Sequence, residues 1–164
     1  PGAAERILAF LDLATFEEGT AIRGGCLVTD PLTRPLEFRV SGAVRPTNLQ
    51  KVLYGDTLQE YISNDLLGIP LMQSLEVKPE LVLVREAEFL KLRPRVGMAV
   101  LWARATVDGQ FVLQAFPGYE QEAEAGRDAL PRRLRGRNIM EPFGRIRTAL
   151  EEAHNLKVGE PRKG

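Results

Sequence analysis

The chain contains few of the residues that build covalent or metal-centred sites. It has one cysteine, Cys26, and one histidine, His154, among its 164 residues. A single cysteine excludes an internal disulfide, and a zinc site would have to take most of its ligands from carboxylates, which is not typical of zinc. Cys26 lies in an apolar stretch and is expected to be an inert core residue. His154 stands near the end of an amphipathic segment, where the helix dipole is a sufficient explanation for it.

The sequence also lacks net charge and long apolar runs. Lys and Arg together number 22 and Asp and Glu number 22, so the formal net charge is zero and argues against binding of polyanions over the whole surface. No apolar run approaches the roughly 18 residues that a membrane span requires, and no signal-peptide pattern opens the chain. We therefore expect a cytoplasmic protein without a membrane partner. Its composition predicts one globular domain over residues 1–156, followed by a flexible tail over 157–164.

Motifs that would assign a chemistry directly are missing. The pair Gly24-Gly25 belongs to neither GxxxxGK[ST] nor GxGxxG, so nucleotide binding through those loops has no support. No serine stands in a GxSxG elbow, which leaves an α/β-hydrolase without support. One cysteine and one distant histidine are also weak evidence for a thiol nucleophile.

The hydrophobic pattern predicts six strands and several helices. The strands are expected at residues 7–13, 24–29, 36–40, 80–85, 98–103 and 111–116. A helical stretch opens at Pro46 and is interrupted or kinked at Gly55-Asp56, because the apolar residues on the two sides are out of phase. Further helices are expected at 88–92, 120–134 and 140–153. We expect the sheet core to contain Leu8, Phe10, Val82, Val84, Val100 and Trp102, and the alternation in 36–40 predicts that Glu37 points to solvent.

The order of these elements, over roughly residues 5–105, resembles the ribonuclease H-like superfamily. The resemblance implies an α/β fold with a mixed central sheet, in which the first three strands are antiparallel and the later strands are linked by helices, and here a C-terminal amphipathic helix follows. It also implies two-metal phosphodiester cleavage, in which several carboxylates converge on magnesium. Asp12 on the first strand and Glu86 after the fourth stand where that family places acids. The first helix, however, opens with residues 47–51 and carries no carboxylate, so Glu17, Glu18 or Glu88 would have to complete the site from loops.

Each of these acids also has a purely structural interpretation. Asp12 ends an apolar run and is typical of a turn-forming or helix-capping acceptor. Glu86 precedes the helical turns around Phe89, where an acid favours the helix dipole.

The densest basic run comes late in the chain. Its members are Arg132, Arg133, Arg135 and Arg137. Such a cluster can bind nucleic-acid phosphates through bidentate hydrogen bonds. The alternative is a solvated helix face that the acidic residues just upstream neutralise.

These observations favour a non-catalytic binding or scaffold component of a larger intracellular assembly, with nucleic acid or a protein as its partner. A second hypothesis is a magnesium-dependent nuclease of ribonuclease H-like type that uses Asp12 and Glu86 as metal ligands and catalytic acids. A third is a domain that binds a small molecule in an enclosed pocket at the carboxyl ends of the strands. Only the nuclease hypothesis requires a cofactor, which is magnesium.

Overall fold

The computed structural model describes residues 7–134 and 138–161 of the chain. Six strands form one sheet in the order β3-β2-β1-β4-β5-β6. They are β1 (Leu8–Phe16), β2 (Ala21–Thr29), β3 (Pro35–Val40), β4 (Leu81–Val84), β5 (Ala99–Ala105) and β6 (Phe111–Ala115). β1, β4 and β5 pair in parallel, whereas β2 and β6 run antiparallel to their neighbours. The mixed sheet that the sequence predicts, with three antiparallel strands followed by helix-linked strands, is confirmed.

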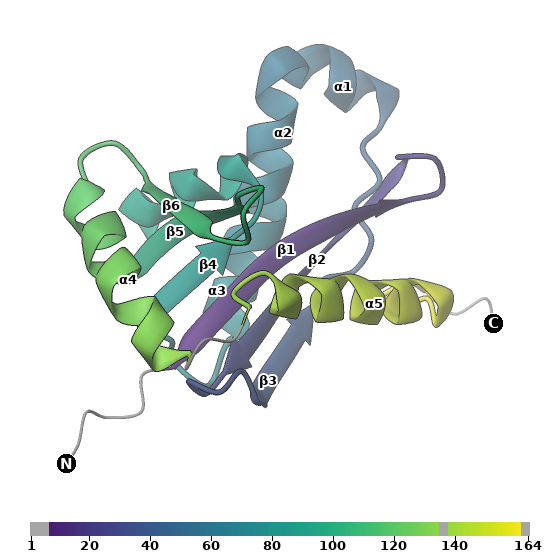
Figure 1. Cartoon of the computed structure of the whole chain (residues 1–164). Coiled ribbons are helices and arrows are strands. Elements are labelled where there is room, and N and C mark those ends of the chain that lie inside the picture. Colours follow the sequence, from purple (N-terminus) through teal and green to yellow (C-terminus); the bar gives the residue numbers. More distant parts are fainter. Residues whose placement is uncertain (1–6, 135–137, 162–164) are drawn as a thin grey trace.

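Helical segments cover both faces of the sheet (Figure 1). The stretch between β3 and β4 consists of α1 (Asn48–Tyr54), η1 (Gly55–Thr57), α2 (Leu58–Glu60), the π-helical η2 (Tyr61–Gly68) and α3 (Ile69–Ser74). The 3₁₀ segment η3 (Ala87–Arg95) links β4 to β5, and α4 (Glu120–Arg133) and α5 (Glu141–Asn155) follow β6. Within the described ranges, no helix combines the length and the apolarity that crossing a membrane requires.

Two apolar clusters form the core, one on each face. Phe10, Leu83 and Leu101 belong to the cluster that α4 and α5 cover, with Phe143 and Leu150 from α5. The cluster on the other face contains residues from β1, β4, η2, α3 and η3. Since helices lie on both faces, the central strands read as continuous apolar runs instead of alternating ones.

The predicted core residues are buried, with one correction. Leu8, Phe10, Val82, Val84 and Val100 are at most 1% exposed. Trp102 is only half-buried and packs at the margin of the second cluster. Its indole Nε1 donates a hydrogen bond to the backbone oxygen of Arg85 at 2.9 Å, so an indole with a polar end lies at the boundary between core and solvent.

The Gly24-Gly25 pair allows helices to approach β2 closely from both faces. A Cβ on Gly24 would lie 3.0 Å from Leu71 Cδ1, and one on Gly25 would lie 3.1 Å from Ile146 Cγ2. Leu71 belongs to α3 and Ile146 to α5. The two glycines therefore serve packing between layers.

The strand pattern of β3 is confirmed, but the predicted orientation of Glu37 is wrong. Its carboxylate accepts hydrogen bonds from the backbone N–H groups of Glu76 and Val77 and pairs with Arg39 at 2.6 Å. Phe38 and its neighbour Leu36 are exposed by 37% and 49% instead. The polar face of this edge strand thus holds the loop after α3, and its apolar face is partly open.

Candidate functional site

Asp12 lies in β1 where the parallel pairing with β4 ends. That pairing stops at Leu11 with Val84, so Asp12 and Arg85 are the next residues on the two strands. Parallel strands present their carboxyl ends at the same edge of a sheet, which is where open α/β sheets bind ligands. The register therefore brings Asp12 and Arg85 together at that edge.

The Asp12 carboxylate is fully buried and both of its oxygens are engaged. Oδ1 accepts the N–H of Leu13 at 2.9 Å. Oδ2 accepts a hydrogen bond from Nη2 of Arg85 at 2.6 Å, within an ion pair. The Arg85 guanidinium lies 5.8 Å from the ring centre of Phe143, and the Arg85 side chain is 27% exposed. Arg85 thus contacts the buried carboxylate on one side and solvent on the other.

Burial raises the pKa of Asp12 from 3.8 to about 6, because a low-dielectric surrounding disfavours the charged form. The hydrogen bond from Leu13 and the positive charges of Arg85 and Arg147 lower this pKa, and the negative charge of Glu86 raises it. The same contributions show that Arg147, from α5, and Glu86 lie within electrostatic range of Asp12. Asp12 and Glu86, the two acids predicted from the strands, are therefore at one edge of the sheet.

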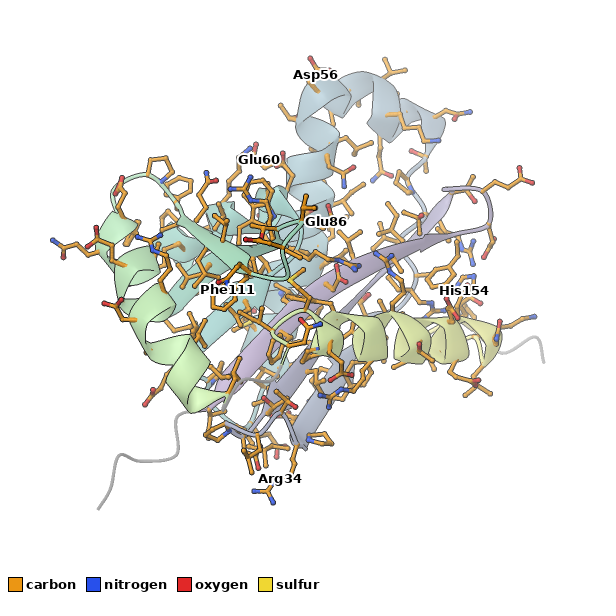
Figure 2. All side chains as sticks on the ribbon, in the orientation of Figure 1. Arg34, Asp56, Glu60, Glu86, Phe111 and His154 are labelled. Carbon is orange, nitrogen blue, oxygen red and sulfur yellow. The ribbon has the colours of Figure 1, made fainter. Side chains whose placement is uncertain are left out.

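Glu86 is the N-cap residue of η3, which is the helix-start position that the sequence predicts for it. Its side chain forms no capping hydrogen bond. Figure 2 shows Glu86 at the upper end of the sheet and Arg34, in the β2–β3 turn, at the lower end. Glu86 is half-buried and thus reaches solvent at the same edge as Arg85.

The described residues do not provide the third carboxylate of a two-metal site. The first turn of α1 contains no acid, and Thr47 and Gln50 form its capping box. Among the loop acids, Glu17 pairs with Arg45 at 2.5 Å and Glu88 pairs with Lys91 at 3.2 Å. Glu18 is exposed in the β1–β2 turn.

The magnesium that the ribonuclease H-like resemblance implies does not fit these residues. Within residues 7–134 and 138–161, no group of three or more His, Cys, Asp or Glu side chains converges as metal ligands would. A guanidinium, which cannot coordinate a metal, contacts the Asp12 oxygen that would have to bind one.

A second arginine, Arg104, is connected to Arg85 through Trp102. The Arg104 guanidinium is stacked 4.2 Å above the centre of the Trp102 ring, and Trp102 in turn bonds to the backbone of Arg85. Arg104 is exposed, and Gln114 is the hydrogen-bond partner of its guanidinium. Arg147 is also exposed. We call Arg85, Arg104 and Arg147 the carboxyl-end arginines. Arg85 and Arg147 lie with Asp12 on the face of the sheet that α5 covers, whereas Arg104 lies with Trp102 on the opposite face.

Little in the sequence pointed to this group. Arg85 could have been found from its position, because it directly follows a buried strand and precedes Glu86. Of the predicted basic run, Arg132 and Arg133 form the last residues of α4, but their side chains lie outside the described residues. Arg135 and Arg137 lie outside them altogether.

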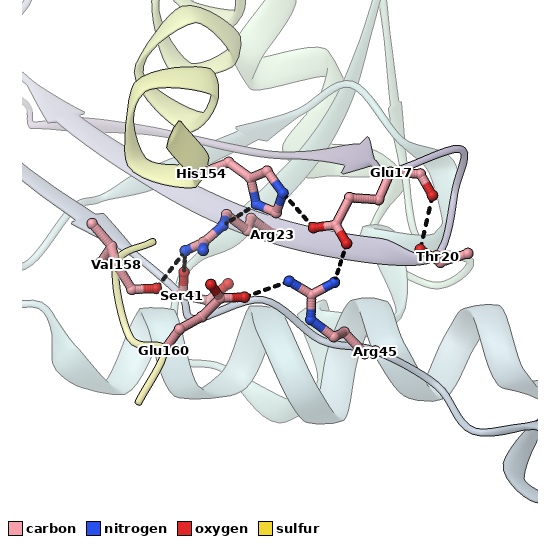
Figure 3. A network of polar contacts seen from close by, with 8 residues as sticks. All are labelled: Glu17, Thr20, Arg23, Ser41, Arg45, His154, Val158 and Glu160. Carbon is pink, nitrogen blue, oxygen red and sulfur yellow. Dashed lines mark hydrogen bonds and ion pairs between the residues drawn. The ribbon is translucent and has the colours of Figure 1, made fainter. Parts of the chain in front are cut away.

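A separate polar network joins the C-terminal segment to the β1–β2 hairpin (Figure 3). Fully buried Arg23 donates from Nε to Nδ1 of His154 at 2.8 Å and from Nη1 to the carbonyl oxygen of Val158 at 2.7 Å. Because Nδ1 accepts a hydrogen bond, Nε2 carries the proton and donates to Glu17 at 2.7 Å. Arg45 pairs with Glu17 and with Glu160.

The first residues of the predicted tail therefore contact the globular body through Val158 and Glu160. A hollow of about 950 Å³ lies beside them and is lined by Ala43, Arg45 and residues 156–161, not by residues around Asp12. Cys26 is fully buried, which raises the pKa of its thiol to about 12. It is the inert core cysteine that the sequence predicts.

No protein-family model matches the sequence, and no curated protein matches it either. Among solved structures, endonuclease V from Bacillus subtilis is similar with a TM-score of 0.46 and 16% identity, covering 70% of this chain and 62% of that one. Endonuclease V from Ciona intestinalis, in complex with an inosine-containing DNA, has a TM-score of 0.45 and 11% identity, covering 77% of this chain and 56% of that one. The chain thus spans less than two thirds of either protein. At these identities and TM-scores the similarity assigns no function.

Proposed function

We propose that this chain is a non-catalytic binding component of a larger assembly and that it binds the phosphate backbone of nucleic acid. The observation that carries the proposal is the group of carboxyl-end arginines at the edge of the sheet where Asp12 is ion-paired with Arg85. The three carboxyl-end arginines reach solvent at this edge of the sheet, where the acids described above are Asp12 and Glu86. These five groups together carry an excess of one positive charge, although the whole chain is neutral.

Guanidinium groups suit this ligand for geometric reasons. Arginine has five N–H donors in a planar fork that matches two phosphate oxygens at once. Arg85 uses Nη2 for Asp12, so its other donors remain for a ligand. Contacts of this kind position a nucleic acid without reading its sequence. We accordingly expect binding with little sequence preference.

The proposal that the chain is non-catalytic is supported by the same edge of the sheet. Two-metal cleavage needs several carboxylates that hold both ions around the scissile phosphate. Here Asp12 is bound to Arg85, and Glu17 and Glu88 have cationic partners elsewhere. Without a second ion to stabilise the leaving oxygen, the rate of hydrolysis falls on the order of a thousandfold or more.

Binding is tested by titrating fluorescent single- and double-stranded DNA and RNA at several salt concentrations. We expect the affinity to fall steeply with salt, and the double variant Arg104→Ala/Arg147→Ala to reduce the slope of log K against log salt by about 1 for each lost phosphate contact. Arg34→Ala is the matched control, because it removes an exposed arginine at the opposite end of the sheet.

Unchanged slopes in the Arg104→Ala/Arg147→Ala variant would place any binding elsewhere. A third variant, with Arg132, Arg133 and Arg135 changed to Ala, separates the predicted basic run from the carboxyl-end arginines. Absence of binding to every substrate at low salt would contradict the proposed function as a whole.

Catalysis is tested separately with the same substrates and Mg²⁺ or Mn²⁺. We expect no cleavage. Asp12→Asn is the control that identifies a contaminating nuclease, because cleavage by a contaminant survives this change. Cleavage that Asp12→Asn abolishes would contradict the non-catalytic proposal and favour the nuclease hypothesis.

A further inference from the structure

We propose that the Arg85 guanidinium takes the place of a divalent cation at Asp12, so that the carboxyl ends of β1 and β4 bind phosphate directly and exclude metal. This inference deepens the proposed function and rests on it only for the identity of the ligand. According to this inference, the presence of Arg85 determines that the site binds its ligand without a metal.

Each oxygen of Asp12 already accepts a hydrogen bond, so a metal would have to compete with these donors for the carboxylate. Its two oxygens accept from Leu13 at 2.9 Å and from Arg85 at 2.6 Å, and the side chain is fully buried. A divalent cation would have to displace a hydrogen-bonded guanidinium from a buried carboxylate. It would then gain at most Asp12 and Glu86 as charged ligands, whereas hard cations such as magnesium depend on several oxygens.

The fold holds Arg85 in this position through three elements. Val84, the residue before it, is paired in register with Leu11 of β1. The Trp102 indole of β5 donates to the Arg85 backbone oxygen at 2.9 Å. The guanidinium lies 5.8 Å from the Phe143 ring of α5. Because these contacts come from the sheet and from α5, Arg85 remains a fixed positive charge beside Asp12.

A fixed guanidinium also suits the ligand better than a bound ion would at this edge. It balances Asp12 on the buried side, and its exposed side retains donors for phosphate oxygens. Arg147 adds a second positive charge within electrostatic range of Asp12. Both charges repel a divalent cation and attract a phosphodiester.

Terbium luminescence provides a direct test, because Trp102 is the only tryptophan in the chain and lies against Arg85. Terbium bound at Asp12 would be excited through Trp102. For the wild-type chain we expect no saturable emission. For Arg85→Asp we expect saturable emission at terbium concentrations about tenfold or more below the highest one at which wild type shows none, since ligand charge sets the affinity of such sites. Adding Asp12→Asn to this variant should abolish the gain.

Arg104→Asp is the matched control. It makes the same change of charge, also beside Trp102, but its guanidinium contacts Gln114 and not Asp12. We expect no gain of terbium binding from it. Arg85→Gln, which removes the charge without adding a carboxylate, should give a smaller gain than Arg85→Asp. For a variant that melts early, the rise of its melting midpoint with Mn²⁺ replaces the luminescence, because a ligand of the folded state stabilises it.

Two results would overturn the inference. One is saturable terbium emission in the wild-type chain that Asp12→Asn removes, which would show that Arg85 does not exclude metal. The other is the lack of any gain, in luminescence or in midpoint, for both Arg85 variants. Nucleic-acid binding by the wild-type chain, expected to persist when EDTA replaces Mg²⁺, separates the two proposals. If nucleic acid is bound in neither condition, the proposed function is contradicted. The terbium experiment then tests by itself whether Arg85 excludes metal from Asp12.

Discussion

A carboxylate buried within a central strand must be neutralised by a neighbouring cation, by hydrogen bonds or by a proton. For Asp12 the ion pair with Arg85 and the N–H of Leu13 lower the pKa, but burial outweighs both and raises it to about 6. The ionised carboxylate is therefore less favourable in the folded chain than in the unfolded one. At the scale of the residue, Asp12 costs stability at neutral pH.

This cost predicts the pH dependence of folding. Between about pH 4 and pH 6 the folded chain binds more protons at Asp12 than the unfolded chain does, so the contribution of Asp12 to the free energy of unfolding falls as the pH rises. A pKa displaced from 3.8 to about 6 corresponds to about 3 kcal/mol. We expect the unfolding free energy of wild type minus that of Asp12→Asn to fall by about this amount from pH 4 to pH 7.

Urea denaturation of both chains across this pH range measures the difference. Asp56→Asn, at an exposed position of η1, controls for the removal of a charge as such. A difference that rises with pH would mean that the ion pair with Arg85 outweighs burial, so that the pKa of Asp12 is lowered by folding and not raised.

At the scale of the element, the short distance between β2 and the helices that cover it limits the size of the side chains that β2 can carry. Gly25 lies between β1 and β3, under α5, where an added Cβ would lie 3.1 Å from both Ile146 Cγ2 and Leu150 Cδ2. A contact this short forces α5 away from the sheet or distorts its side chains. The glycine is therefore a condition for the close packing of α5.

Gly25→Val should lower the free energy of unfolding by about 1–3 kcal/mol, the usual cost of overpacking. Gly144→Ala, in α5, is the opposite case, because a Cβ there meets nothing within 4 Å. It should raise stability by about 0.5–1 kcal/mol, since alanine favours the helix. Chemical denaturation of both variants measures whether the free energy of unfolding falls for Gly25→Val and rises for Gly144→Ala. An equal effect at the two positions would contradict the packing argument.

At the scale of the whole molecule, Arg23 joins segments that are far apart in the sequence. It bonds to Ser41 after β3, to His154 in α5 and to Val158 near the C-terminus. Its side chain is fully buried, so these hydrogen bonds connect the three segments from inside the fold.

Arg23→Ala should therefore lower the free energy of unfolding by about 3 kcal/mol, because three hydrogen bonds from a charged and fully buried donor are lost at about 1 kcal/mol or more each. Lys51→Ala, at an exposed position of α1, should change it by less than about 0.5 kcal/mol. Equilibrium denaturation measures both, and a small effect of Arg23→Ala would show that the network contributes little to the fold.

The sequence by itself determined the elements and their order. Continuous apolar runs marked the central strands, Asp108-Gly109 marked the β5–β6 hairpin, and Gly55 marked the break in the helical stretch, where its φ is +52°. These features are local: they depend on the spacing of apolar residues and on backbone conformations that glycine tolerates. Asp12 and Glu86 could be placed at one edge of the sheet because the resemblance implied parallel neighbouring strands.

Only the tertiary structure decided which charges meet. An alternating pattern does not state which face of an edge strand packs, so Glu37 was assigned to solvent, whereas the loop after α3 supplies N–H donors to it. Likewise, Arg85 became the partner of Asp12 through register between strands 73 residues apart in sequence. Ion pairing depends on distance in space and on burial, and sequence spacing carries neither for residues on different strands.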